Sequence, residues 1–440
     1  MRRPARTAAL GLALASLLAA PAAAAPLSMA EAMRLAVQRN LTAKLARSED
    51  EAARARTLEA ASQLLPMVAG SLSQQRVFRV NLAAEGLSGG GFATMLGPFD
   101  VFDARFRLAM SVLDLHSWLR LSAARRSARA AALQEDLAGE QVAGAAALAY
   151  IEALRAREAI RSAQAGVDLA SELLALARER LTAGTAMGLD VARARTREAE
   201  ESLRLLDART AATDADLRLK RIAGLPLGEP LELTDMLVVS STAVPPLDAT
   251  LADAQSGRLE LRISQDRLQA AGLLVKAARA DRLPRLLATA DAGLSGNQPD
   301  SGARTTGSIG AALSLPLFDG GLAARTSEAR AADQEARSRY DDLLLAVEED
   351  ARRAEDRLSE AAQRVGATRL ASQLAREELK LARGRFAAGV GDNLELVNAQ
   401  TELARADDQL AAALAQFETA RVNRALAVGR MRDFKFQETP

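Results

Sequence analysis

The chain contains a long internal repeat, which limits the folds open to it more than any other feature. Residues 180–184 have the sequence Arg-Leu-Thr-Ala-Gly, and residues 385–389, 205 positions later, have the sequence Arg-Phe-Ala-Ala-Gly. Asp114 and Asp319 are related by the same offset. A repeat of roughly 200 residues is far longer than the unit of a solenoid protein. We therefore interpret the chain as two copies of one half-protein that serve a single task together.

The first 25 residues are typical of a secretory signal peptide. Three arginines precede an apolar segment at residues 8–18, and alanines near Ala23 offer a cleavage site. The apolar segment is shorter than the ~20 residues that a transmembrane helix needs. We expect residues 1–25 to be removed, residues 26–240 and 245–430 to form the two repeats, and residues 431–440 to form a C-terminal tail.

The composition favours long helices over an ordinary globular core. Aromatic residues make up only 3% of the chain, whereas alanine, leucine, arginine and glutamate are abundant. The formal net charge of +1 gives no sign of nucleic-acid binding, which requires a strongly basic surface. The chain has no cysteine, so disulfide bonds cannot stabilise it.

Each repeat is expected to follow the order helix, strand, loop, strand, very long helix, turn, helix. The expected helices run from about Ser28 to Leu64, Ser117 to Leu181, Leu189 to Ile222, Ala249 to Arg282, Leu322 to Ala387 and Leu394 to Val428. Each long helix would span roughly 100 Å, and two short helices laid end to end match that length. The sequence therefore predicts a rod of paired helices.

Two sets of residues have the 3.5-residue period of left-handed coiled coils. The clearer set is Leu344, Val347, Ala351, Ala354, Leu358, Ala361 and Val365. The weaker set is Leu203, Leu206, Thr210, Thr213 and Leu217. We expect both sets to lie at helix–helix contacts.

Two strands are expected before each long helix. They are residues 67–75, 105–112, 286–295 and 308–317, and most alternate between apolar residues and small or polar ones. One such strand alone would fit a soluble sheet, but four beside very long helices favour transmembrane β-strands. Four strands cannot close a barrel, so the chain must oligomerise. A dimer would supply eight strands and a trimer 12. Small inward residues favour the trimer, because it leaves a pore.

The predicted fold class is therefore mainly α with a transmembrane β part. It is an internally duplicated, long coiled-coil α-barrel, joined to four strands per chain that contribute to a trimeric 12-stranded β-barrel.

Several motifs together resemble the TolC-like outer-membrane efflux protein family. They are residues 184–191, Gly-Thr-Ala-Met-Gly-Leu-Asp-Val; residues 389–396, Gly-Val-Gly-Asp-Asn-Leu-Glu-Leu; residues 314–321, Ser-Leu-Pro-Leu-Phe-Asp-Gly-Gly; and the linker at residues 224–228. The resemblance covers essentially the whole mature chain. It implies a homotrimer in the outer membrane whose helices extend into the periplasm. It also implies the exit duct of a tripartite efflux or type I secretion pump, with a periplasmic adaptor protein and an inner-membrane transporter as partners.

The resemblance also implies that the helical turns form a periplasmic tip that opens when the pump assembles. Gly184 and Gly389 would end the long helices at this tip. Glu395 and Asn398 fall where the family commonly has rings of carboxylates, and Asp190 is the acid of the first turn.

Two positions depart from the family pattern. Asn398 removes one possible ring of charge, and Gly391 stands where relatives can carry a basic residue that pairs with the first turn's acid. We therefore do not expect that ion pair to hold this tip shut. A simpler alternative for Asp190 and Glu395 is that an acid at a helix N-terminus interacts favourably with the helix dipole.

Other singled-out residues lie where strands meet helices. Asp114 and Asp319 precede the long helices and are expected to cap them. Trp118, Phe106 and Phe318 could form an aromatic belt at the membrane interface, although ordinary packing explains them equally well. His116 is the chain's one histidine, and it has no neighbours at metal-ligand spacing. We expect no metal and no cofactor.

Three classes of function were weighed. No nucleophile motif or phosphate loop argues for an enzyme, and no catalytic residue is assigned. A periplasmic coiled-coil adaptor or structural protein is the main alternative to a channel, but an adaptor should have one hairpin beside globular domains. The exported substrate, whether drugs, metal ions or polypeptides, stays open, as does the transporter that the channel serves.

Overall fold

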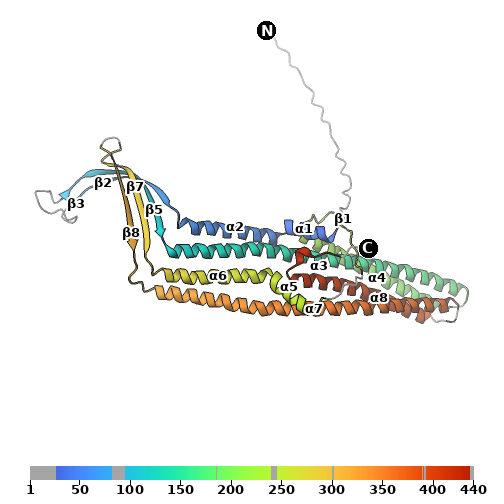
Figure 1. The fold of residues 1–440 in the computed structure, drawn as a ribbon. Helices are drawn as coiled ribbons and strands as arrows, with labels where there is room; N and C mark the ends of the chain where they lie inside the picture. The colour runs from blue at the N-terminus through green and yellow to red at the C-terminus, as the bar shows by residue number, and fades with distance from the viewer. Residues whose placement is uncertain are drawn as a thin grey trace, which may run out of the picture.

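The computed structural model describes residues 26–81, 95–184, 186–238, 245–299, 302–388, 390 and 393–436. The long helices lie side by side in a rod, the four long strands leave one end of it, and both helical turns lie at the other end (Figure 1). The expected signal peptide lies outside the described residues. No helix in these ranges has an apolar stretch long enough to cross a membrane.

The two repeats have the same order of elements. The first contains α1 (Met29–Arg39), α2 (Leu41–Ser62), β2 (Met67–Val77), β5 (Phe99–Leu113), α3 (Leu115–Thr182) and α4 (Gly188–Ala223). The second contains α5 (Leu247–Gly257), α6 (Leu259–Ala280), β7 (Arg285–Gly296), β8 (Arg304–Ser314), α7 (Leu322–Ala387) and α8 (Asn393–Ala427). Short elements complete the chain: β1 (Pro26–Leu27), β3 (Val80–Asn81), β4 (Met95–Leu96), β6 (Glu232–Leu233) and the 3₁₀-helix η1 (Met431–Asp433).

The first helix of each repeat is broken, and the prediction of one continuous helix there was wrong. Asn40 and Arg258 have extended backbone, with ψ of 142° and 115°. The Asn40 side chain accepts a hydrogen bond from the Thr42 backbone N–H at 2.9 Å, which satisfies a free donor at the start of α2. A local change in the backbone thus breaks the helix at a place where the hydrophobic periodicity of the sequence continues without a break.

The four long strands form one antiparallel sheet in the order β2-β5-β7-β8. In the β5–β7 pair, Arg105 lies opposite Gly293, where an added Cβ would come within 2.2 Å of the Ala104 carbonyl oxygen. The observed strand β8 ends at Ser314, before the predicted end at residue 317. Among the described residues, the outer edges of β2 and β8 pair with no strand.

The helices form a single curved layer. α3 packs against α2 and α4 on one side and against α6 and α8 on the other, while α7 packs against α5, α6 and α8. Two short helices thus follow one another along each long helix, as the lengths predicted. The far side of α7 and the outer sides of α2 and α4 are left as the edges of the layer.

The clearer of the two predicted seams is confirmed from Val347 to Val365, although Leu344 at its start is 38% exposed, and the weaker one is wrong. Val347, Ala351, Ala354, Leu358, Ala361 and Val365 are all buried. In α4, however, Leu203 and Leu206 are 62% and 57% exposed. The seam of α4 runs instead through Leu205, Ala208, Ala212, Ala215 and Leu219, because these residues face α3. Both stripes have a similar period, so periodicity alone could not choose between them.

The main core lies at the middle of the rod, where the ends of several helices meet. Tyr150 is fully buried there, and its hydroxyl donates a hydrogen bond to the Leu27 carbonyl at 2.9 Å. β1 pairs with β6 in the linker between the repeats, which packs around this core. Gly224 ends α4 with φ of +66°, in the left-handed conformation that glycine adopts most easily.

Candidate functional site at the helical turns

The free end of the rod is formed by two turns, one from each repeat (Figure 1). α3 ends at Thr182 and α4 begins at Gly188, while α7 ends at Ala387 and α8 begins at Asn393. Gly184 has φ of +73° and no atom within 4 Å of an added Cβ, so the turn needs glycine for its backbone conformation alone. Gly389 and Gly391 lie outside the described residues.

The acids at the two turns are in different environments. The Asp190 carboxylate accepts a hydrogen bond from the Met187 backbone N–H at 3.0 Å, as an acid in the first turn of a helix does. Glu395 forms an ion pair with Arg385 of its own hairpin, with 3.2 Å between Oε1 and Nε. Asn398 is exposed one turn further along α8.

Arg180 is not among the site residues predicted from the sequence, yet its side chain contacts the end of α7. Its Nη2 donates hydrogen bonds to the carbonyl oxygens of Phe386 and Ala387, the latter at 3.3 Å. Its guanidinium carbon lies 3.9 Å from the centre of the Phe386 ring. The only sequence signal was its place in the repeated motif, where it corresponds to Arg385.

A small core supports this contact. Leu173 of α3 packs with Leu379 and Phe386 of α7 and with Leu396 of α8. Glu172 and Arg383 form an ion pair across the same two long helices. The two hairpins of one chain therefore meet near their tips through both apolar and polar contacts.

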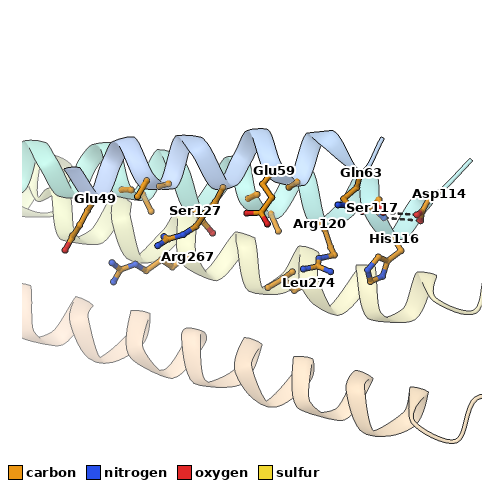
Figure 2. Close-up of a pocket in the computed structure, with 18 of the residues that line it drawn as sticks. Glu49, Glu59, Gln63, Asp114, His116, Ser117, Arg120, Ser127, Arg267 and Leu274 are labelled. Carbon is orange, nitrogen blue, oxygen red and sulfur yellow. Dashed lines mark hydrogen bonds between the residues drawn. The ribbon is translucent and has the colours of Figure 1, made fainter. Parts of the chain in front are cut away.

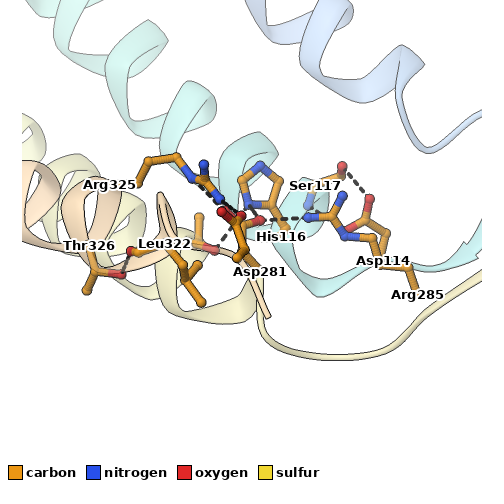
Figure 3. Close-up of polar contacts among 10 residues, drawn as sticks. Asp114, His116, Ser117, Asp281, Arg285, Leu322, Arg325 and Thr326 are labelled. Atoms are coloured by element: carbon orange, nitrogen blue, oxygen red, sulfur yellow. Dashed lines mark hydrogen bonds and ion pairs between the residues drawn. The ribbon is translucent and has the colours of Figure 1, made fainter. Parts of the chain in front are cut away.

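The opposite end of the helices meets the strands at corners that are tied together by charged residues (Figure 3). The Asp281 carboxylate lies 2.7 Å from Nδ1 of His116 and 2.6 Å from Nη2 of Arg285, and its other oxygen lies 3.7 Å from Nε of Arg325. These side chains come from the corners β5–α3, α6–β7 and β8–α7. His116 thus lies between α3 and the end of α6.

The two repeat-related aspartates at these corners differ in role. Asp114 caps α3, accepting hydrogen bonds from the Ser117 N–H at 3.1 Å and the Ser117 hydroxyl at 2.8 Å. Asp319 does not cap α7, whose N-cap is Gly321; the expected cap there is wrong. Asp319 instead accepts a hydrogen bond from the Gly321 N–H at 2.8 Å and pairs with Arg325, because the chain makes an extra turn before the helix starts.

We expect Asp114→Ala to lower the free energy of unfolding by about 1 kcal/mol, since it removes an N-cap. Burial by itself raises the pKa of Asp114, but the hydrogen bonds from Ser117 and the charge of Arg285 outweigh it, so this pKa lies below the usual 3.8. The cap should therefore stabilise the protein at neutral pH and be lost only as the pH falls through that depressed pKa. Denaturant titration followed by circular dichroism measures the difference. Asp319→Ala is the control, and an equal loss there would contradict the assignment.

A large cavity lies beside the corners, between α2, α3 and α6 (Figure 2). Its volume is about 1130 Å³, and alanines of α3 such as Ala123 and Ala130 form part of its wall. Arg56, Arg120 and Glu59 also line it, so both signs of charge are present. In the described part of the chain no group of three acidic, histidine or cysteine side chains could hold a metal ion.

The three candidate interface aromatics are exposed in the single chain. Trp118, Phe106 and Phe318 are 54%, 70% and 92% exposed. Phe106 lies in the sheet, and the other two lie at the first residues of α3 and just before α7. Large apolar side chains in such positions need a further partner or a lipid environment to cover them.

Sequence comparison finds one family model and one curated relative that match part of the chain. Residues 250–430 match the model of the outer membrane efflux protein family. The alkaline protease secretion protein AprF of Pseudomonas aeruginosa is 29% identical over 284 residues, which are 62% of this chain and 58% of that protein. The match thus spans less than two thirds of that relative's length.

Solved structures show the same fold. The outer membrane channel CmeC of Campylobacter jejuni superposes with a TM-score of 0.77 over 91% of this chain and 85% of its own, at 19% identity. The outer membrane protein VceC of Vibrio cholerae and the open state of the MtrE outer membrane channel of Neisseria gonorrhoeae also reach 0.77 over 91% of this chain. They are each 20% identical to it, and the match covers 96% and 89% of their own chains. The resemblance inferred from the sequence is confirmed, as are the long helices joined to four strands per chain.

Proposed function

We propose that this chain belongs to the outer membrane efflux protein family and forms a homotrimeric duct through the outer membrane with its helices in the periplasm. It is a passive conduit that catalyses no reaction. As the exit duct of a tripartite efflux or type I secretion pump, it would work with a periplasmic adaptor protein and an inner-membrane transporter. The family match and the shared fold support this proposal.

The main support for the proposal is that both the sheet and the layer of helices have edges that nothing in the described part of the chain covers. β2 and β8 end the sheet with unpaired backbone groups, which a protein cannot leave in lipid. On the helical side, Leu370, Leu374 and Leu381 of α7 are 56–68% exposed along its open face. Leu203 and Leu206 are similarly exposed on α4, at the other edge. Further copies of the chain, joined edge to edge, would cover both.

The sheet has the two faces that a duct wall requires. Ser71, Arg105 and Asp291 lie on one face, where Arg105 Nη1 and Asp291 Oδ2 are 3.0 Å apart. Leu72, Phe106 and Ile309 lie on the opposite face and are 70% exposed or more. A polar lining and a lipid-facing surface fit a transmembrane barrel. Three copies would supply 12 strands.

We further propose the boundaries given by the sequence: a signal peptide at residues 1–25, repeats at 26–240 and 245–430, and a tail at 431–440. Cell fractionation tests the location. Recovery of the protein in the outer membrane supports the duct, whereas recovery only in soluble periplasm would favour the adaptor alternative.

At the turns, Glu395 is the residue expected to attract cations, together with Gly184, Asp190, Gly389, Gly391 and Asn398 as the proposed tip. Three copies would bring three Glu395 carboxylates near the axis, although the ion pair with Arg385 partly neutralises each. Glu395→Gln should lower the cation-to-anion permeability ratio roughly twofold, because it removes one negative charge per copy at the narrow end.

Reversal potentials in a salt gradient across planar bilayers measure this ratio. Asn398→Asp is the matched opposite variant, since it adds a carboxylate one helical turn away and should raise the ratio. Unchanged reversal potentials for both variants would remove the turns from the selective part of the duct.

A further inference from the structure

The polar face of the strand sheet carries more positive than negative charge. Arg285, at the start of β7, pairs with Asp281 at the corner. Successive residues of a strand point to opposite faces, so the register of the sheet assigns the remaining charged side chains to a face. Three arginines and two aspartates lie on the polar face: Asp103, Arg105, Arg107, Asp291 and Arg304. Three positive and two negative charges leave one net positive charge on this face of the described strands.

Both aspartates are engaged with a single arginine, Arg105. Its Nε donates to Oδ1 of Asp103 at 2.7 Å, and its Nη1 donates to Oδ2 of Asp291 at 3.0 Å. Asp291 also accepts a hydrogen bond from the hydroxyl of Ser308 on β8. These contacts join β5 to β7 and β7 to β8. The charge of Arg105 is therefore balanced inside the sheet and serves its structure.

Arg107 lies on the same face, two residues further along β5, and is not balanced in this way. It stands directly opposite Asp291 in the sheet, but that carboxylate is already held by Arg105. None of the hydrogen bonds or ion pairs among the described residues involves Arg107, and the residue is exposed. Its guanidinium keeps a planar fork of donors that matches a carboxylate or a phosphate.

The side chains around Arg107 leave room for a solute. Ala69 faces it from β2, and Gly310 and Ala109 lie further along the same face. None of these residues carries a charge or a bulky group. A solute that passes along this face of the sheet can therefore reach the guanidinium.

We propose that Arg107 is a specificity-determining residue that makes the strand part of the duct favour anionic solutes, those with carboxylate, sulfonate or phosphate groups. The inference rests on the proposed function, because the polar face lines a passage only in that duct. Positive charge on the wall of a passage attracts anions and repels cations. Glu395 would act in the opposite sense at the far end of the helices. Anionic compounds are thus the class of cargo that the strand part selects.

Reversal potentials across planar bilayers at low salt measure the anion-to-cation permeability ratio. Arg107→Gln should lower this ratio about twofold, because it removes the positive charge that no carboxylate balances. Arg107→Lys keeps the charge and should keep most of the ratio. Asp291→Asn should raise the ratio, since it removes a negative charge from the same face.

Arg76→Gln is the matched control. Arg76 is an exposed arginine of β2, and the register places it with Leu72 on the opposite, apolar face of the same sheet. Its removal changes the net charge by the same amount and should leave the ratio unchanged. Equal ratios for Arg107→Gln and Arg76→Gln would overturn the proposed role of Arg107.

Block of the potassium chloride current by inorganic tripolyphosphate gives a second readout. The anion is added to one chamber at a time. Arg107→Gln should raise the concentration for half block at least threefold, whereas Arg76→Gln should not change it. The same half-block concentration in the unaltered protein and in Arg107→Gln would contradict the anion site. Absence of channels from the unaltered protein is a different result, and it would contradict the proposed duct itself.

Discussion

Leu374→Asp is expected to abolish the trimer while the single chain still folds. Leu374 is 56% exposed on the open face of α7, in line with Leu370 and Leu381. It belongs to neither of the hydrophobic clusters that α7 forms with α8. In the proposed trimer this stripe is covered by the next copy. Replacing it with a charge would then bury an unpaired carboxylate, which costs on the order of 3–5 kcal/mol at each of three interfaces.

The measurement is the heat-modifiable band of the trimer in a denaturing gel of outer membranes. Gln373→Asp is the control, because it adds the same charge at an exposed position one residue away, on a different side of the helix. A trimer band that survives Leu374→Asp would show that this face of α7 is not an interface. Loss of the band in both variants would point to a general effect of the added charge.

Gly429→Ala is expected to destabilise the fold strongly, because backbone strain and steric overlap occur at the same residue. Gly429 follows α8 with φ of +68°, where a residue with a Cβ is strained. The added Cβ would also lie 2.6 Å from the Gly257 carbonyl oxygen, which belongs to the break between α5 and α6. Strain and overlap together should lower the free energy of unfolding by on the order of 3 kcal/mol.

Thermal unfolding followed by the helical circular dichroism signal measures this loss. Gly366→Ala is the control, since an added Cβ there meets no atom within 4 Å inside an α-helix, and it should be neutral or slightly stabilising. Equal midpoints for the two variants would contradict the packing described at the middle of the rod.

A similar close contact occurs in the first repeat. It explains why a glycine follows the last helix of each copy, Gly224 in the first and Gly429 in the second. An added Cβ on Gly224 would lie 2.6 Å from Cβ of Arg39, the residue that corresponds to Gly257. The sequence showed that Gly224 ends a helix. It did not show that both glycines make close contact with the first helix of their own repeat, because that contact joins residues about 180 positions apart.

The architecture could be predicted because its causes are local or repeated. Helix lengths, alternating strands and the duplicated turn fixed α7 at Leu322–Ala387 and placed the other long elements within a few residues. The breaks at Asn40 and Arg258 were missed, since each depends on one backbone torsion within an otherwise helical pattern. The α4 seam was missed because two parallel stripes had a similar period.

The site was harder to predict than the fold. Charge and family position singled out Asp190 and Glu395, but the contact that joins the turns comes from Arg180 and the carbonyl groups of α7. An arginine that donates to backbone carbonyls leaves no pattern in the sequence, because every residue has a carbonyl group. Only the difference between the two copies, phenylalanine at 386 and leucine at 181, marks the place.

The number of chains in the native assembly tests the central claim most directly. Native mass spectrometry of the protein, extracted from outer membranes in mild detergent, counts the copies without assuming a shape. Our account predicts three copies of a chain that begins near residue 26. A monomer would leave the outer edges of β2 and β8 unpaired, and a dimer would supply only eight strands, which close around side chains without a pore; either result would contradict it.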